Sequence, residues 1–243
     1  MKLSLGVDIG STTAKIVVLR DDTAVFTRYA RHYSKIRDTV TAMLAEAADA
    51  LSVLGIGRDA PLSCAMSGSA GMGLAEAAGV PFVQEVWATG QVVRRLEPDT
   101  DAVIELGGED AKILFFGGSV DERMNGACAG GTGAFIDQMA SLLDMTPDEM
   151  DEASLRYEKL YPIASRCGVF AKTDIQPLLN QGARKEDVAA SIYQAVANQT
   201  ISGLAQGRRI TGKVMFLGGP LSFCKGLRCL LYTSDAADER SSV

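Results

Sequence analysis

The sequence predicts an α/β protein made of two similar halves, each with a mixed β-sheet and helices. Short apolar runs separated by acidic, glycine-containing turns are typical of strands joined in hairpins. Longer alanine-rich segments with apolar residues at helical spacing follow these runs. The same order of elements occurs twice. Hydrophobic residues make up 47% of the 243 residues, enough for a sizeable core.

The first half, residues 1–98, is expected to form one domain. Asp21-Asp22 separates two strand patterns as a tight hairpin, and Gly55 and Gly79 mark the ends of two helices. The expected elements, in order, are strands over Leu3–Val7, Ala14–Leu19 and Thr23–Tyr29, a helix over Asp38–Val53, a strand over Leu62–Met66, and helices over Leu74–Ala78 and Glu85–Leu96.

The second half, residues 99–228, repeats this plan. Gly107-Gly108-Glu109-Asp110 is an acidic turn between strands, and Gly218-Gly219 ends the last strand. The expected elements are strands over Ala102–Leu106, Ala111–Phe116 and Ser119–Met124, helices over Gly133–Leu143, Pro147–Ala153 and Lys185–Gln206, and a strand over Lys213–Leu217. With the boundary near Pro98–Asp101 and no low-complexity linker, the halves are expected to pack around a cleft.

The C-terminal residues do not follow the pattern. Tyr232–Arg240 has no apolar periodicity and resembles translated sequencing-adapter sequence. Residues 229–243 are therefore expected to be a non-native tail, with a junction as early as Arg228. The chain is expected to be the N-terminal part of a longer protein.

Composition excludes several function classes. A net charge of −6 argues against nucleic-acid binding, and the longest apolar runs are too short to span a bilayer. No signal-peptide pattern precedes the first strand, so a reducing cytoplasm is expected. There, five cysteines indicate metal ligands, redox groups or buried thiols. The one histidine, His32, lies in a charged polar stretch, which argues against histidine-based metal sites and Ser-His-Asp triads.

Three turns have the composition of phosphate- and nucleotide-binding loops. Asp8-Ile9-Gly10-Ser11-Thr12-Thr13-Ala14-Lys15 follows a strand, and its small residues let backbone N–H groups approach a phosphate. Glu105-Leu106-Gly107-Gly108-Glu109-Asp110-Ala111-Lys112 repeats the design. Val214–Leu221 ends a strand in a glycine pair on which an adenine ring could lie flat. Each turn alone is also compatible with an ordinary hairpin.

Together the three turns resemble the two phosphate motifs and the adenosine motif of the actin, sugar-kinase and heat-shock-chaperone ATPase superfamily. The resemblance implies an actin-like, ribonuclease H-like ATPase fold with two mixed-sheet subdomains on either side of a nucleotide cleft. It also implies ATP and magnesium, with Asp8 holding the ion through water.

Two cysteines adjoin glycine-rich stretches that precede expected helices: Cys128, followed by Ala129-Gly130-Gly131-Thr132-Gly133, and Cys167, followed by Gly168. Helix N-termini favour thiolates, but a thiolate-bound iron–sulfur cluster needs four ligands. Two cysteines per chain therefore indicate a cluster shared across a symmetric dimer.

Met124–Phe135 and Ser165–Asp174 are similar to the activators of 2-hydroxyacyl-CoA dehydratases, a family that includes the benzoyl-CoA reductase ATPase subunits. The resemblance extends from about Leu3 to Arg228. It implies a homodimer with one 4Fe–4S cluster held by Cys128 and Cys167 of each subunit, which donates one electron to a dehydratase or a related iron–sulfur reductase. Ferredoxin or flavodoxin is the implied electron source. By motif position the implied catalytic residues are Asp8, Glu105 and Glu109, and the implied cofactor-binding residues are Gly10, Ser11, Thr12, Thr13, Lys15, Gly107, Gly108, Gly130, Gly131, Thr132, Gly218 and Gly219.

The second turn departs from the family pattern. Glu105 replaces the usual aspartate and Glu109 the usual glutamine, which puts the hydrolysis rate in doubt more than nucleotide binding. Two alternatives therefore stay open. A small-molecule kinase of the same superfamily would use a cleft carboxylate as base and need no cluster. A non-hydrolysing nucleotide sensor would follow if Glu105 and Glu109 disable hydrolysis.

Overall fold

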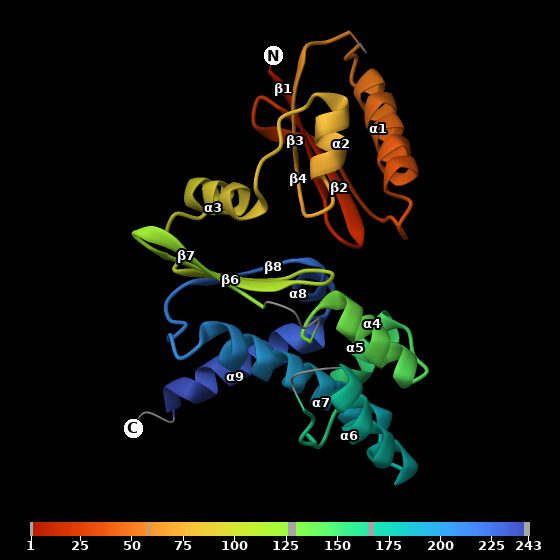
Figure 1. The fold of residues 1–243 in the computed structure, drawn as a ribbon, viewed down its shortest axis with the longest axis vertical. Coiled ribbons are helices and arrows are strands. Elements are labelled where there is room, and N and C mark those ends of the chain that lie inside the picture. Colours follow the sequence, from red (N-terminus) through yellow and green to blue (C-terminus); the bar gives the residue numbers. More distant parts are fainter. Residues whose placement is uncertain (1, 58, 126–129, 165–167, 241–243) are drawn as a thin grey trace. The chain divides into compact units, whose positions relative to one another are not determined.

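The computed structural model describes residues 2–57, 59–125, 130–164 and 168–240. The chain divides into two compact units, Met1–Leu96 and Glu97–Val243. Each contains one four-stranded mixed sheet, and the two sheets have the same topology, β3-β2-β1-β4 in the first unit and β7-β6-β5-β8 in the second (Figure 1). The repeated sequence pattern thus corresponds to a repeated fold.

The first unit starts with an antiparallel meander whose third strand is followed by a helix. Its elements are β1 (Leu3–Ile9), β2 (Thr13–Arg20), β3 (Thr23–Arg31), α1 (Ile36–Val53), β4 (Leu62–Ser67), α2 (Met72–Ala78) and α3 (Glu85–Leu96). Asp21 and Asp22 both have positive φ (49° and 70°), which matches the twist of the β2–β3 hairpin. After α1, strand β4 returns parallel to β1.

Alternating residues of this sheet form the core of the first unit. Val7 and Ile9 of β1, together with Ala14 and Ile16 of β2, point to one face and pack against Val40 and Met43 of α1. This face is apolar because strand residues alternate between the two sides of a sheet. The hydrophobic positions of β1 and β2 therefore fix the register that places Asp8 opposite Lys15.

The second unit repeats the meander and adds a group of helices. Its elements are β5 (Ala102–Leu106), β6 (Ala111–Gly117), β7 (Ser119–Met124), α4 (Gly133–Leu142), α5 (Pro147–Ser154), α6 (Gly168–Asn180), α7 (Lys185–Asn198), the π-helix η1 (Gln199–Leu204), β8 (Val214–Leu217), α8 (Gly219–Phe223) and α9 (Lys225–Arg240). Figure 1 shows α4 to α7 and α9 on one side of this sheet.

The core of the second unit lies between this sheet face and the helices. Ile104 of β5 and Ile113 of β6 belong to the same buried cluster as Ile192 and Tyr193 of α7, and all four are at most 2% exposed. Helix α7 is buried on most sides, which explains why Val188–Ala197 contains few polar residues. This core therefore supports β5 and β6, the two strands that the turn after β5 joins.

Helices α8 and α9 are absent from the sequence expectation, and α7 ends before the expected Gln206. The single helix expected over Lys185–Gln206 continues as a π-helix after Asn198. Here the hydroxyl of Thr200 donates to the carbonyl of Val196 (2.9 Å) and competes for a helical acceptor.

Helix α9 extends into the segment set aside as a tail. Leu230 and Leu231 are buried (5% and 1% exposed) because they complete an i, i+3, i+4 pattern that starts at Leu227. Asp151 of α5 accepts hydrogen bonds from the backbone N–H groups of Lys225 and Gly226 (2.9 Å each) and so caps this helix. Leu230 and Leu231 thus belong to the buried cluster of the second unit, and the non-native origin of residues 229–243 stays a prediction.

Across the described part of the chain, every helix is too short or too polar to cross a lipid bilayer.

Candidate functional site

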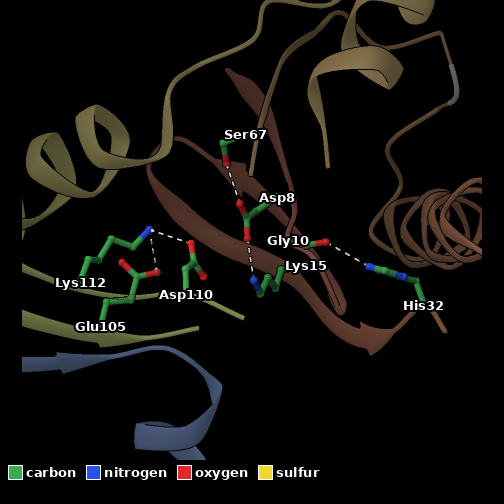
Figure 2. A network of polar contacts seen from close by, with 8 residues as sticks. All are labelled: Asp8, Gly10, Lys15, His32, Ser67, Glu105, Asp110 and Lys112. Atoms are coloured by element: carbon green, nitrogen blue, oxygen red, sulfur yellow. Dashed lines mark hydrogen bonds and ion pairs between the residues drawn. The ribbon is translucent and has the colours of Figure 1, made fainter. Parts of the chain in front are cut away.

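The first turn presents a carboxylate that two neighbouring strands hold in place. Asp8 lies near the end of β1, opposite Lys15 on β2 and Ser67 on β4. The ammonium of Lys15 lies 2.7 Å from Oδ2 of Asp8, and the hydroxyl of Ser67 donates to Oδ1 (2.9 Å) (Figure 2). The side chains of Asp8 and Lys15 are 34% and 42% exposed, so solvent reaches both charges. This carboxylate is fixed in orientation yet accessible to a ligand.

The turn after Asp8 is closed by a backbone hydrogen bond. The N–H of Gly10 donates to the carbonyl of Thr13 (2.9 Å), so Gly10, Ser11, Thr12 and Thr13 form a tight loop between β1 and β2. Ser11 and Thr12 are half-buried, and Thr13 is buried. Small residues and hydroxyls in such a loop are suited to bind an anion such as phosphate.

The second turn has the same construction. Glu105 and Lys112 are cross-strand partners on β5 and β6, seven residues apart (112 − 105), as are Asp8 and Lys15 (15 − 8). The N–H of Gly107 donates to the carbonyl of Asp110 (2.7 Å), which is the counterpart of the Gly10–Thr13 bond. The two halves therefore agree in hydrogen bonding as well as in sequence.

The charged pair of the second turn is much less accessible. The side chains of Lys112 and Glu105 are 2% and 15% exposed. The Lys112 ammonium lies 3.7 Å from Oε1 of Glu105 and 3.9 Å from Oδ2 of Asp110 (Figure 2). One buried cation thus balances two carboxylates, while Glu109 at the tip of the turn is exposed. Exposure leaves the Glu109 carboxylate open to a ligand or a water.

Two further segments of the second unit meet this turn. The N–H groups of Gly133 and Ala134, the first residues of α4, donate to the carbonyls of Gly107 and Gly108 (2.9 and 2.8 Å). A Cβ added to Gly133 would lie 3.5 Å from Cγ of Pro220, which follows Gly219. The second turn, the start of α4 and the Gly218-Gly219-Pro220 turn therefore converge.

Gly218 and Gly68 are equivalent positions in the two halves. Each follows the parallel fourth strand of its sheet, with φ of 89° and 91°. A Cβ on Gly218 would overlap the carbonyl oxygen of Leu106, and one on Gly68 would overlap that of Ile9. Both positions require glycine, because the backbone approaches the end of the central strand too closely for a side chain.

The Ser67–Gly71 segment is a part of the first site that the sequence patterns did not predict. The N–H of Ala70 donates to the carbonyl of Ile9 (2.9 Å), which places this segment directly against the first turn. The signal was present, because Gly68 follows Ser67, the last residue of β4, as Gly218 follows Leu217, the last residue of β8. Matching the two halves residue by residue would have found it.

His32 was also missed. The sequence analysis placed it in a polar stretch, but it is 3% exposed and its ring lies 3.0 Å from the carbonyl oxygen of Gly10 in the first turn (Figure 2). The charged neighbours of His32 in sequence concealed this burial, because the contact joins residues 22 positions apart.

Cys128 and Cys167 lie outside the described residues, but the segments that flank them are in contact. Gly168, the first residue of α6, packs on α4, since a Cβ there would lie 2.5 Å from Oε1 of Gln138 and 3.8 Å from Cδ2 of Phe135. Gly130, Gly131 and Thr132 are buried, and Gly131 lies against the junction of α7 and η1 near Gln199. The helices that follow the two cysteines in sequence therefore pack on each other.

The three described cysteines are free thiols and do not resemble ligands. Burial raises the pKa of the Cys64 and Cys224 thiols, which disfavours the thiolate. Within the described residues, no three His, Cys, Asp or Glu side chains are grouped to hold a metal ion. Asp8 supplies a single carboxylate at its turn, which fits magnesium bound largely through water.

Comparison with known proteins places the chain in a family. The model of the BadF/BadG/BcrA/BcrD ATPase family matches residues 5–229. The chain belongs to this family. Its fold agrees with that of the solved component A of (R)-2-hydroxyglutaryl-CoA dehydratase from Acidaminococcus fermentans, with a TM-score of 0.85 and 26% identity over 96% of this chain and 89% of that one. The predicted actin-like ATPase fold is thereby confirmed.

Two further comparisons agree with the assignment to this ATPase family. The (R)-2-hydroxyglutaryl-CoA dehydratase activating ATPase of Acidaminococcus fermentans is 29% identical over 89% of this chain and 82% of its own length. The solved activator of 2-hydroxyisocaproyl-CoA dehydratase from Clostridium difficile, with bound ADPNP, has a TM-score of 0.82 and 25% identity, covering 96% of this chain and 86% of that one. The expectation that the chain is the N-terminal part of a longer protein stays a prediction.

Proposed function

We propose that this member of the BadF/BadG/BcrA/BcrD ATPase family is an ATP-dependent one-electron donor that activates an iron–sulfur enzyme of the 2-hydroxyacyl-CoA dehydratase type. The observation that supports it most is the duplicated turn, in which each half joins a carboxylate to a lysine across the same strand pair. The named relatives are dehydratase activators, one of them solved with an ATP analogue.

In this proposal the first turn binds magnesium and phosphate. Asp8 would hold Mg²⁺ through water, and the Ser67 hydroxyl and Lys15 ammonium keep the Asp8 carboxylate in place. Ser11, Thr12 and Thr13 supply backbone N–H groups and hydroxyls to phosphate oxygens, and Gly10, whose own N–H closes the turn, lets the backbone approach the phosphate. Lys15 adds a positive charge that is accessible enough to reach an anion.

The second and third turns have distinct proposed roles. Gly107 and Gly108 approach phosphate, while the exposed Glu109 positions the attacking water in place of the usual glutamine. Glu105 would provide a carboxylate on the side where Mg²⁺ binds, and the contact with Lys112 limits the movement of that carboxylate. Gly218 and Gly219 give the adenosine a flat backbone surface. Gly130, Gly131 and Thr132 connect the nucleotide turns to the cysteine segment.

A 4Fe–4S cluster, held by Cys128 and Cys167 of each of two subunits, would supply one low-potential electron. Support comes from the described residues that adjoin Cys167. Val169 and Phe170 directly follow Gly168 and are 68% and 63% exposed, so two adjacent large apolar side chains face solvent at the start of α6. A homodimer interface on this surface would cover them and bring two pairs of cysteines together.

The proposed partners follow from the relatives and from redox balance. The dimer takes one electron from ferredoxin or flavodoxin and passes it to the dehydratase, so the donor is oxidised by one electron as the acceptor is reduced. Each turnover is tied to ATP hydrolysis, which releases phosphate and prevents the electron from returning. Nucleotide-dependent movement of α4 and α6 is the proposed coupling, because α4 contacts the second turn and α6 packs on α4.

The test is electron transfer from anaerobically loaded, reduced protein to a purified 2-hydroxyacyl-CoA dehydratase. With Mg-ATP we expect one electron transferred per dimer, and none with ADP. Asp8→Asn should lower ATP turnover about a hundredfold, the usual effect of removing a group that stabilises a developing charge. Asp22→Asn, at the exposed β2–β3 hairpin, is the matched control. A colourless protein that hydrolyses ATP only with a sugar present would contradict the proposal and favour the kinase.

A further inference from the structure

His32 continues the β2–β3 ladder beyond the end of β3. Its backbone N–H donates to the carbonyl of Thr12 (3.1 Å), one step past the Thr13–Arg31 pair. Tyr33 and Ser34 follow with positive φ (46° and 64°), a conformation uncommon for residues other than glycine. This sharp turn directs the chain back so that the ring of His32 is buried against the first turn.

The hydrogen bonds of the ring define its tautomer. The backbone N–H of Ser34 lies 3.2 Å from Nδ1, and the carbonyl oxygen of Gly10 lies 3.0 Å from Nε2. A backbone N–H can only donate and a carbonyl oxygen can only accept. Nδ1 is therefore the acceptor, and Nε2 carries the proton and donates to Gly10.

These contacts fix two peptide planes of the first turn. In a trans peptide the carbonyl and the following N–H point in opposite directions. Because His32 binds the carbonyl oxygens of Gly10 and Thr12, the N–H groups of Ser11 and Thr13 are directed away from His32. The N–H groups of the loop are thereby oriented before any anion arrives.

We propose that His32 is a positioning residue for phosphate binding by the first turn. It acts through the Gly10–Ser11 peptide and does not touch the ligand. The inference rests on the proposed function, since it requires this turn to bind phosphate. Loss of the Nε2 donor should weaken Mg-ATP binding about five- to tenfold, the effect of one hydrogen bond. The maximal rate of hydrolysis should change much less, because the reacting groups remain.

Two substitutions separate the two ring nitrogens. His32→Gln keeps an N–H donor near the position of Nε2, whereas His32→Asn keeps an acceptor near Nδ1 and loses the donor to Gly10. We expect KM for Mg-ATP to rise in His32→Asn and to be largely restored in His32→Gln. Tyr33→Phe, on the exposed neighbouring side chain, is the matched control and should behave as wild type.

Because the sequence has one histidine, its imidazole ¹⁵N resonances in the intact protein need no assignment. We expect a pyrrole-type signal for Nε2 and a pyridine-type signal for Nδ1, and both should shift when the non-hydrolysable analogue Mg-ADPNP is added. An Nδ1–H tautomer would overturn the inference even if the variants fail to fold. The inference would also be overturned by two results together: the wild type binds Mg-ADPNP without a change in the ¹⁵N signals, and His32→Asn binds it with the same affinity as the wild type. A wild type that binds no nucleotide would instead overturn the proposed function, and this inference with it.

Discussion

At the scale of single residues, the two carboxylate–lysine pairs are equivalent in register but differ in environment. Asp8 and Lys15 are about one-third to two-fifths exposed, whereas Lys112 is 2% exposed beside Glu105. Solvent screens the first pair, so its net contribution to stability is small. A buried pair is different, because removing one partner leaves the other charge uncompensated in a poorly solvated place.

We therefore predict that the same substitution has unequal effects in the two halves. Lys112→Met should lower the free energy of unfolding by about 3 kcal/mol, while Lys15→Met should lower it by less than about 1 kcal/mol. Urea denaturation of both variants, followed by circular dichroism, measures the difference. Equal losses would mean that the Glu105–Lys112 pair is not held in a buried environment.

Residue-scale prediction from sequence worked where the information is local. The turns after Asp8 and Glu105 follow from their small residues, and the structure closes both with the same hydrogen bond. Contacts between distant segments were missed. His32 reaches Gly10 across 22 positions and Ser67 reaches Asp8 across 59, and neither contact leaves a periodic pattern in the sequence.

At the scale of elements, most strands and helices lie where the patterns of apolar residues place them. Two corrections have physical causes. The hydroxyl of Thr200 bonds back to Val196, and here α7 continues as a π-helix. Helix α9 continues past Arg228 because Leu227, Leu230 and Leu231 face the core together and Asp151 caps its first turn. Composition concealed this helix, since only its first part is apolar.

Helix α9 provides a second prediction. Leu231→Ala should cost about 2–5 kcal/mol of unfolding free energy, because the side chain is 1% exposed within the core of the second unit. Tyr232→Ala, at a neighbouring position that is 71% exposed, should change it by less than about 0.5 kcal/mol. Thermal denaturation of the two variants provides the comparison. If Leu231→Ala is as stable as wild type, this segment does not pack on the core and acts only as a tail.

At the scale of the whole molecule, the chain contains two units with the same sheet topology, and the second unit also carries a larger group of helices. Both units have a four-stranded sheet of identical order and a closed turn after the first strand. Only the second carries the Cys128 and Cys167 segments, next to the helices α4 and α6 that pack on each other. In the second unit, the contact between α4 and α6 therefore links the second turn to the segments of the proposed metal group.

The sequence alone led to the correct family and fold, because the glycine-rich motifs are specific and their order is preserved. The roles of the site residues, the shared cluster and the dimer stay predictions. They depend on Cys128 and Cys167, which lie outside the described residues, and on a partner subunit. Measuring whether the thiols of Cys128 and Cys167 bind iron tests the shared cluster more directly than measuring the stability of packing variants.

The most direct test of the central claim is the iron and sulfide content of anaerobically reconstituted protein, combined with electron paramagnetic resonance after reduction. A 4Fe–4S cluster held by four thiolates, two from each chain, predicts about two irons per chain and a reduced-cluster signal that changes when Mg-ATP is added. Cys128→Ala combined with Cys167→Ala should abolish both the iron and the signal, whereas Cys64→Ala should retain them. A double variant that still carries a full 4Fe–4S spectrum would contradict the account.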